Sequence, residues 1–455
     1  MKITITGASG LLGRRLMVKL LEGGHEVVAV CRNRETISEL PSGNIFEWDA
    51  LGGPFPENAL QSVDAVIHLA GHPVGDGRWT EKTKSNILNS RTRGTKSLVD
   101  AISKMSTEKR PRVFLNGSAI GFYGSQSDQK LDESSAGGAG FLARVVMQLE
   151  TESSRARTLG LRVVDLRTGV VLSRNGGALP KMPPFVLGSG KQWLSWIHIE
   201  DWLSGVCHIL ENSAVIGPLN LTATEPVTQE VFVQALRRVV SFPVRIRIPE
   251  IVLRATLGEM AELLLSSQRV VPQKLQSSGF NFRFNAIDSA LEDLFGESSY
   301  LENEFLMWQF VPASVEAAFD FFSEAANLQK ITPEWLHFNI LKKSTPMIQE
   351  NTVIDYRLRV HGYPLRWRSQ ILDWKPTESF VDLQLKGPYS RWHHLHTFKK
   401  VSGGTLIGDR VHYRVPGHIF GKILLSSFVA RDVRKIFDFR RGRIERFFSN
   451  GRHES

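Results

Sequence analysis

A glycine-rich turn near the N-terminus constrains the fold of this chain more than any other feature. Residues 2–6 alternate and are rich in β-branched side chains, which is typical of a strand. Gly7, Gly10 and Gly13 follow at intervals of three, and the sequence predicts a helix over about 11–21. The free N–H groups and the dipole at such a helix start suit a phosphate. The context predicts a dinucleotide-binding turn, with an ordinary strand–turn–helix as the alternative.

Strands and helices alternate along the first two-thirds of the chain. Apolar and β-branched runs predict strands near 24–32, 44–49, 64–71, 112–118 and 161–167, with helices near 79–103 and 141–159. This alternation predicts an α/β fold, a doubly wound parallel sheet with helices on both faces. Residues 173–296 predict a smaller substrate-side part, with helices near 201–212, 227–240, 251–265 and 287–295 and a strand at 280–284.

The end of the second predicted strand bears on the choice of dinucleotide. In folds that prefer NAD an acidic residue here binds the ribose diol, whereas this chain has Cys31, Arg32, Asn33 and Arg34. A cation suits the 2′-phosphate of NADP, so Arg32 favours NADP. The alternative is a solvated loop arginine. Asp49, after the third strand, is a candidate contact for the adenine.

The fourth predicted strand is nearly all apolar, as a parallel strand covered on both faces should be. It ends in Ala70 and Gly71, small residues that leave space beside a cofactor. His68 lies inside this strand, which favours a packed side chain over a catalytic one.

The composition limits the classes of function. A chain of 455 residues is too long for one core, so two or three domains are expected. The net charge of +10 permits nucleic-acid binding, but no nucleic-acid motif accompanies it and we expect no such partner. The two cysteines, Cys31 and Cys207, imply no disulfide framework and fit a cytoplasmic protein. No apolar run is long enough to span a membrane, and the oligomeric state is left open.

Motifs along residues 1–296 carry a resemblance to a known family. They lie at 6–13, 68–71, 90–91, 118–124, 167–172, 188–201, 217–222, 257–260 and 267–272, and the block containing Trp196, Ile197 and His198 is very specific. With them the segment resembles the extended short-chain dehydrogenase/reductase superfamily and, within it, the epimerase family of nucleoside-diphosphate-sugar epimerase-like proteins. The resemblance implies a Rossmann fold, NADP and a small-molecule substrate. It implies cofactor contacts at Gly7, Ser9, Gly10, Leu11, Leu12, Gly13, Cys31, Arg32, Asp49, Leu69, Ala70, Gly71, Asn86, Arg91, Ser118 and Val170.

The chain departs from the superfamily where the chemistry is done. Active members use a tyrosine and a lysine four residues after it, and the lysine lowers the pKa of the tyrosine. A glutamate commonly follows four residues after the lysine. Glu150 matches this glutamate, which places Leu142 and Val146 at the tyrosine and lysine positions. Arg91 stands where an asparagine is usual. Ser118 is the remaining member of the usual four.

Other side chains are candidates to replace the missing pair. Ser118, Tyr123 and His198 are the candidate catalytic residues, with Lys191 and Asp201 nearby in sequence. Each has a structural alternative: Tyr123 packing under the cofactor, His198 bonding to backbone, Asp201 capping a helix. A tyrosine without a neighbouring cation keeps a pKa near about 10 and is a better proton donor than base.

Two functions therefore remain open at the level of sequence. One is an NADP-dependent oxidoreductase or epimerase, with a slow reductase favoured over a fast epimerase. The other is a non-catalytic or regulatory NADP-binding protein.

Residues 297–455 predict a second domain after a short polar joint at 296–300. A strand near 304–310, helices near 312–322 and 327–333, strands near 353–360, 365–374, 379–386, 392–401 and 404–415, and a long helix near 417–448 are expected. This order, with the motifs at 312–319 and 328–333, resembles the helix-grip fold of the START-like superfamily, closest to its cyclase/dehydrase-like branch. The resemblance implies an α+β domain whose curved antiparallel sheet wraps the last helix around a cavity for an apolar ligand.

Side chains of this second domain suggest further sites. Four tryptophans are candidates for a cavity lining, with plain core as the alternative; they are Trp335, Trp367, Trp374 and Trp392. On a strand His394 and His396 share a face while His393 points away. Because the sequence offers no cysteine or carboxylate at ligand spacing, we expect no metal site. The long basic helix permits contact with anionic lipid, but its apolar face is expected to pack on the sheet.

Overall fold

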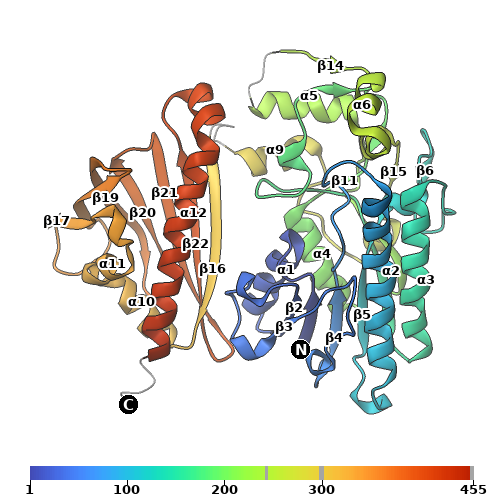
Figure 1. Cartoon of the computed structure of the whole chain (residues 1–455), viewed down its shortest axis with the longest axis horizontal. Helices are drawn as coiled ribbons and strands as arrows, with labels where there is room; N and C mark the ends of the chain where they lie inside the picture. Colours follow the sequence, from blue (N-terminus) through green and yellow to red (C-terminus); the bar gives the residue numbers. More distant parts are fainter. Residues whose placement is uncertain (241–243, 297–301, 451–455) are drawn as a thin grey trace. The chain divides into compact units, whose positions relative to one another are not determined.

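A computed structural model describes residues 1–240, 244–296 and 302–450, apart from the side chains of 418–424 and 450. The chain divides into two compact units, shown in Figure 1. The first comprises Met1–Ile37 and Ser42–Glu297, and the second comprises Ser38–Pro41 and Ser298–Ser455. The expected joint at 296–300 lies, beyond Gly296, outside the described residues.

A seven-stranded parallel sheet forms the centre of the first unit. Its order is β12-β7-β5-β4-β1-β2-β3, and every neighbouring pair is parallel. The strands are β1 (Lys2–Thr6), β2 (Glu26–Cys31), β3 (Ile45–Glu47), β4 (Ala65–His68), β5 (Val113–Ala119), β7 (Arg162–Thr168) and β12 (Gly217–Leu221). Helix α1 packs on α4 and α2 on α3, so helices cover both faces, as Figure 1 shows. These helices are α1 (Leu11–Glu22), α2 (Glu81–Ser103), α3 (Phe141–Thr158) and α4 (Ile199–Glu211).

The central strands are buried from both sides. Ile3 and Ile5 of β1 are fully buried on one face, and Thr4 and Thr6 are fully buried on the other. All four residues of β4 are also buried. Such strands occur in parallel sheets covered by helices on both faces. The expected doubly wound α/β fold is confirmed.

The rest of the first unit surrounds the carboxyl ends of these strands with short ladders and helices. The paired strands are β6 (Lys130–Leu131) with β15 (Arg269–Val270), β8 (Val170–Leu172) with β11 (Trp196–His198), β9 (Val186–Leu187) with β14 (Arg247–Ile248), and β10 (Trp193–Leu194) with β13 (Val227–Thr228). The helices are α5 (Gln229–Val240), α6 (Glu250–Leu257), α7 (Glu262–Leu265), α8 (Gln273–Ser277) and α9 (Ile287–Phe295).

Two sequence-based expectations for this part are wrong. The helix expected over 251–265 is broken between α6 and α7, because Gly258 has φ +62° and ends α6. The strand expected over 280–284 is irregular chain. There the backbone N–H groups of Arg283 and Phe284 donate to the carboxylate of Asp201 instead of to a strand, each at 2.9 Å.

The second unit is an antiparallel seven-stranded sheet with helices packed on it, the expected helix-grip fold. The strand order is β16-β22-β21-β20-β19-β18-β17. The elements are β16 (Glu302–Val311), α10 (Val315–Ser323), α11 (Ala325–Ile331), β17 (Asn339–Lys343), β18 (Val353–Val360), β19 (Tyr363–Lys375), β20 (Ser379–Lys386), β21 (Arg391–Val401), β22 (Gly404–Arg414) and α12 (His418–Asn450). The edge strand β17 was not predicted.

The core of the second unit lies between its sheet and its helices. Phe319 and Phe322 of α10 contact Phe398 of β21, and Ile444 of α12 belongs to the same cluster. Val433, Phe437 and Ile444 of α12 are buried, as expected for a face packed on the sheet, whereas Leu425, Phe428 and Phe447 are 46–48% exposed. Among the described residues, no helix is both long and apolar enough to cross a membrane.

We predict that residues 1–296 fold on their own, because the sheet and its covering helices lie in the first unit. The segment Ser38–Pro41 groups with the second unit, so some loss of stability is expected. The fragment should unfold in one cooperative thermal transition followed by circular dichroism. An insoluble fragment, or one without a cooperative transition, would contradict the prediction.

Candidate functional site

The glycine turn between β1 and α1 leaves no room for side chains. Gly7 has φ +68°, and a Cβ added there would lie 2.8 Å from the Leu69 backbone. A Cβ on Gly13 would lie 2.3 Å from the Gly7 carbonyl oxygen. Gly10 is the N-cap of α1 and supplies no side-chain cap, so the first N–H groups of the helix are left for another acceptor. These residues fit a dinucleotide pyrophosphate.

The hydroxyl of Thr6 connects the end of β4 to this turn by hydrogen bonds. Thr6 Oγ1 accepts hydrogen bonds from the N–H groups of Leu69 at 3.1 Å and Ala70 at 3.2 Å, and lies 2.7 Å from His68 Nδ1. His68 is buried, and burial lowers its pKa to about 4. His68 is thus packed, as expected. The strand order reverses between β1 and β4, where ligands bind in such sheets.

The loop after β2 presents Arg32 to solvent. Asn33 accepts a hydrogen bond from Glu35 N, and Arg34 donates to the Ser42 carbonyl oxygen, at 2.9 and 3.0 Å. Arg32 is exposed, and no hydrogen bond or ion pair to another described residue holds its side chain. Asp49 is exposed after β3, where its Oδ1 accepts from Leu51 N at 3.0 Å. Both side chains are therefore reachable by a ligand at this sheet edge.

Arg91 of α2 braces the loop after β4. Its Nη1 donates to the carbonyl oxygens of His72 at 2.9 Å and Ile87 at 3.1 Å, and burial lowers its pKa to about 10. A Cβ on Gly71 would lie 3.2 Å from its Cζ atom. The structure thus brings Gly71 and Arg91 together.

Asn86 on α2 and Val170 on β8 are half-buried. The cofactor contacts of these residues stay predictions.

A buried polar network lies at the carboxyl ends of β5 and β7. Glu150 Oε1 accepts from Ser118 Oγ at 2.7 Å and from Arg167 Nε at 2.9 Å, and its Oε2 accepts from Arg167 Nη2 at 2.7 Å. Arg167 Nη1 donates to the Tyr123 hydroxyl at 3.0 Å, and that hydroxyl donates to Asn220 Oδ1 at 2.8 Å. One ion pair therefore holds the two candidate hydroxyls, Ser118 and Tyr123.

Tyr123 occupies a structural position in this network. Its side chain is 0% exposed, and burial raises its pKa. The expectation that no cation neighbours it is wrong, because Arg167 is within hydrogen-bond distance. Sequence spacing gave no sign of this contact, which joins the 3₁₀ turn after β5 to β7. The geometry favours the structural alternative for Tyr123.

His198 also has a structural position. It is the N-cap of α4, where its Nδ1 accepts from Glu200 N at 3.2 Å, and its ring packs 3.9 Å from the ring of Phe284. Nε2 lies 3.5 Å from Asp293 Oδ2. Burial lowers the pKa of His198 to about 4, with a smaller contribution from the charges of Arg283 and Arg15.

Apolar contacts occupy the place of the usual tyrosine and lysine. Leu142 and Val146 lie on the face of α3 that carries Glu150, two turns and one turn before it, respectively. A Cβ on Gly121 would lie 3.3 Å from Leu142 Cβ and 3.9 Å from Val146 Cγ2. Neither side chain can transfer a proton, so the site keeps its anchoring glutamate without the acid–base pair.

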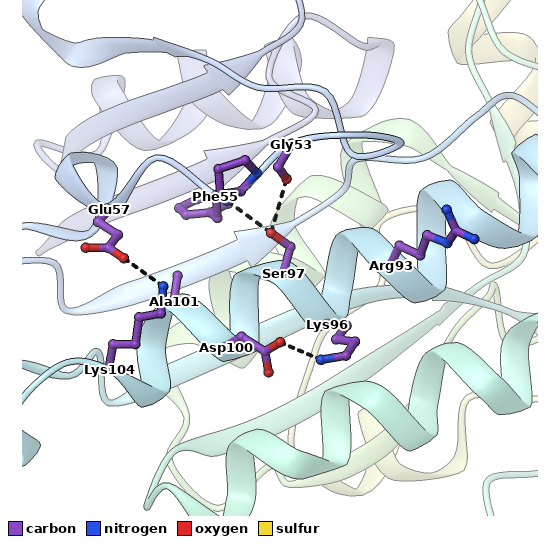
Figure 2. A pocket seen from close by; sticks show the side chains of 10 residues that line it. Gly53, Phe55, Glu57, Arg93, Lys96, Ser97, Asp100, Ala101 and Lys104 are labelled. Carbon is purple, nitrogen blue, oxygen red and sulfur yellow. Dashed lines mark hydrogen bonds and ion pairs between the residues drawn. The ribbon is translucent and has the colours of Figure 1, made fainter.

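A separate hollow of about 360 Å³ lies between α2 and the segment 53–57, as Figure 2 shows. Four of its charges are matched in pairs, Lys96 with Asp100 at 2.6 Å and Lys104 with Glu57 at 3.2 Å, and Arg93 also lines it. Among its described lining residues none is a predicted cofactor contact. The hollow is therefore not the candidate cofactor site.

The second unit contains a buried cluster that the sequence analysis missed. His394 Nε2 donates to Asp409 Oδ1 at 2.8 Å, and His396 Nδ1 lies 3.1 Å from the same oxygen. The expectation of no companion carboxylate is wrong, because Asp409 comes from the neighbouring strand β22. Arg440 Nη2 of α12 lies 3.9 Å from Asp409 Oδ1. Only the strand pairing, not spacing along the chain, brings these groups together.

Burial sets the charge states in this cluster. It lowers the pKa of His396 to about 3. Although burial raises the pKa of Asp409, the charge of Arg440 and the neighbouring imidazoles of His394 and His396 bring it well below the usual range.

A cavity of about 50 Å³ adjoins both imidazoles and Arg440, and its walls are mostly phenylalanine and isoleucine. The four candidate tryptophans do not line it: Trp335 is 53% exposed, and Trp367, Trp374 and Trp392 pack in the core.

Comparisons with known proteins match three segments of the chain. Residues 3–221 match the NAD dependent epimerase/dehydratase family, 248–294 a domain of unknown function (DUF1731), and 311–438 the polyketide cyclase / dehydrase and lipid transport family.

The relatives by sequence cover the first unit. Epimerase family protein YfhF of Bacillus subtilis is 37% identical over 306 residues, which are 65% of this chain and 99% of that protein. Epimerase family protein Mb2239 of Mycobacterium bovis is 36% identical over 297 residues, 64% of this chain and 96% of the relative. The crystal structure of human epimerase family protein SDR39U1 with NADPH has a TM-score of 0.56 and 29% identity, covering 65% of this chain and 99% of that one.

We expect His198 to stabilise the fold as a neutral side chain. The pKa of His198 is about 4 in the folded chain and 6.5 in the unfolded chain. The neutral imidazole therefore contributes its full share to the free energy of unfolding above pH 6.5, and this contribution is lost as the pH falls through 4. The loss amounts to about 3 kcal/mol. His198→Asn keeps an N-cap acceptor and removes the titration. The free energy of unfolding, measured with urea at pH 7.5 and 5.0, should change less with pH in this variant than in the parent chain. An unchanged dependence would contradict the assignment.

Proposed function

The chain belongs to the epimerase family, within the NAD-dependent epimerase/dehydratase family, and we propose that its first unit is an NADPH-dependent oxidoreductase. The observation that carries the proposal is the exposed Arg32, placed directly after β2 on the sheet edge that holds the glycine turn. A guanidinium donates paired hydrogen bonds to a phosphate, and NADH lacks the 2′-phosphate. The NADPH named for the human relative supports the same cofactor here.

The proposed cofactor contacts follow the carboxyl edge of the sheet. Gly7, Gly10 and the start of α1 would hold the pyrophosphate, and Arg32 would bind the 2′-phosphate. Ser118, at the end of β5, is the proposed polar side chain beside the nicotinamide. The bound cofactor would supply a hydride, and the protein would hold the carbonyl that receives it.

Reduction is easier to support at this site than epimerisation. An epimerase must first remove a proton from a hydroxyl, and Leu142 and Val146 replace the residues that do so. A reduction needs a proton delivered to the carbonyl oxygen. Ser118 donates its hydroxyl hydrogen to Glu150 Oε1, so it would have to turn that hydrogen towards the substrate to position the oxygen. Because a serine hydroxyl is a weak acid, a slow reduction is expected.

Arg32→Ala should weaken NADPH binding by about 1.5–3 kcal/mol and leave NADH binding unchanged, because it removes a charge-assisted hydrogen bond to the 2′-phosphate. Arg93→Ala is the matched control, since Arg93 lines the hollow on α2 and lies outside the predicted contacts. Fluorescence titration of both nucleotides measures the effect. Equal affinity for NADH and NADPH in the parent chain would overturn the preference.

Ser118→Ala should lower NADPH oxidation with a carbonyl substrate by about tenfold or more, while NADPH affinity changes little. Ser153→Ala removes another buried hydroxyl, one that donates to Asp165 at 2.6 Å, and should leave the rate per folded molecule unchanged. Assays with a panel of aldehydes and ketones measure both variants. Equal rates in the two variants would remove Ser118 from the reaction.

A specific observation favours a second candidate, a non-catalytic NADPH-binding protein. Tyr123 and His198 are 0% and 1% exposed, and their polar groups serve the fold. Tight NADPH binding without oxidation by any member of the carbonyl panel would support this candidate over the reductase.

For the second unit, the match to the polyketide cyclase / dehydrase and lipid transport family supports binding of an apolar ligand. The cavity of about 50 Å³ is smaller than the few hundred Å³ of a typical ligand pocket. Such a ligand would therefore have to displace part of the wall.

A further inference from the structure

The cluster around Asp409 is an unusual set of groups to place inside an apolar core. His394, His396 and Asp409 are 3–4% exposed, and Arg440 of α12 is 8% exposed. Burying charged groups costs several kcal/mol per ion, and a well-packed apolar core is often at least as stable. Fold stability alone therefore does not account for this cluster, and perturbed buried groups beside a cavity indicate a functional site.

The sheet brings three ligand atoms to one point. His396 lies opposite Asp409 in the β21–β22 ladder, and His394 lies two residues before it on the same face. His394 Nε2, His396 Nδ1 and a carboxylate oxygen of Asp409 all lie within 4.8 Å of one another. Two imidazole nitrogens and one carboxylate oxygen form a set that binds Zn²⁺ or Fe²⁺ with positions left open.

One of these atoms has no hydrogen-bond partner among the described residues. His396 Nδ1 is buried and points toward Asp409 Oδ1, yet the geometry does not make a hydrogen bond. His394 Nε2 already donates to that oxygen. A buried polar atom without a partner is costly, and a cation between the three atoms would satisfy it.

The distances fit an empty site that needs a small adjustment. The two nitrogens lie 2.8 and 3.1 Å from Asp409 Oδ1. With metal–ligand bonds of about 2.1 Å in a tetrahedral arrangement, such donor atoms are separated by about 3.4 Å. The adjacent cavity of about 50 Å³ has room for roughly two or three water molecules, which could complete the coordination.

The negative charge near the cluster could be balanced either by a proton or by a metal cation. Asp382 lies opposite His394 in the β20–β21 ladder, and its Oδ1 is buried without a hydrogen-bond partner among the described residues. Two carboxylates thus face one permanent cation, Arg440, which lies 3.9 Å from Asp409. A proton on Asp382 would balance this charge without a metal, but it would leave His396 Nδ1 unsatisfied.

From this geometry we propose that His394, His396 and Asp409 bind one divalent transition-metal cation, Zn²⁺ or Fe²⁺, inside the second unit. The site is independent of the cofactor site of the first unit. It would place a Lewis acid at the wall of the cavity.

The test uses the full chain without a histidine tag, freed of metal by a chelator. Equilibrium dialysis against Zn²⁺, and against Fe²⁺ without oxygen, should load one ion per chain. His396→Ala and Asp409→Asn should each weaken binding at least about 100-fold, the upper range for lost supporting residues. His393→Ala is the matched control, because His393 lies on the same strand and faces the other way. Its affinity should equal that of the parent.

A measurement on the parent chain keeps the proposal testable if a variant fails to fold. X-ray absorption of the Zn²⁺-loaded chain should show two imidazole ligands and oxygen ligands at about 2.0–2.2 Å. Three outcomes would overturn the proposal: no bound ion in the parent, an ion without imidazole ligands, or equal binding by folded His396→Ala. If the parent chain binds no metal and Asp382→Asn is more stable than the parent chain, the cluster instead holds a proton on Asp382.

Discussion

The first unit depends on the largely buried ion pair between Glu150 and Arg167. The pair joins α3 to β7, and its hydrogen bonds extend to Ser118 on β5, to Tyr123, and through Tyr123 to Asn220 on β12. Three neighbouring strands and a helix are thereby fixed at the edge where the cofactor is expected. A buried pair is tolerated when its remaining donors and acceptors are satisfied. Here Glu150 accepts three hydrogen bonds and all three guanidinium nitrogens of Arg167 donate.

This arrangement explains how the site keeps its shape without the usual acid–base pair. Glu150 is held by Arg167 and Ser118, so the anchor does not require a lysine on α3. Leu142 and Val146 can then pack as apolar side chains against Gly121. The scaffold for a cofactor and the machinery for proton transfer are thus separable in this chain, and the structure retains the scaffold.

The sequence predicts local features of this protein well and its long-range contacts poorly. The glycine turn, the alternation of strands and helices and the helix-grip order all follow from periodicity and from short motifs. The contact of Arg167 with Tyr123 and the approach of Asp409 to His394 do not, because they depend on which strands become neighbours. The error at 280–284 has a similar cause, since the carboxylate of Asp201 takes backbone N–H groups that local pattern assigns to a strand.

The hydroxyl of Thr6 fixes more than the distance between two strand ends. Its oxygen accepts from Leu69 N, which also donates to the Thr6 carbonyl oxygen, and from Ala70 N, so its own proton can point to His68 Nδ1 at 2.7 Å. In that arrangement the neutral imidazole carries its hydrogen on Nε2. Protonation of His68 would place a second hydrogen between Nδ1 and Thr6, where no acceptor remains. Protonation would therefore weaken one side-chain link between β1 and the end of β4, beside the glycine turn where the cofactor is expected.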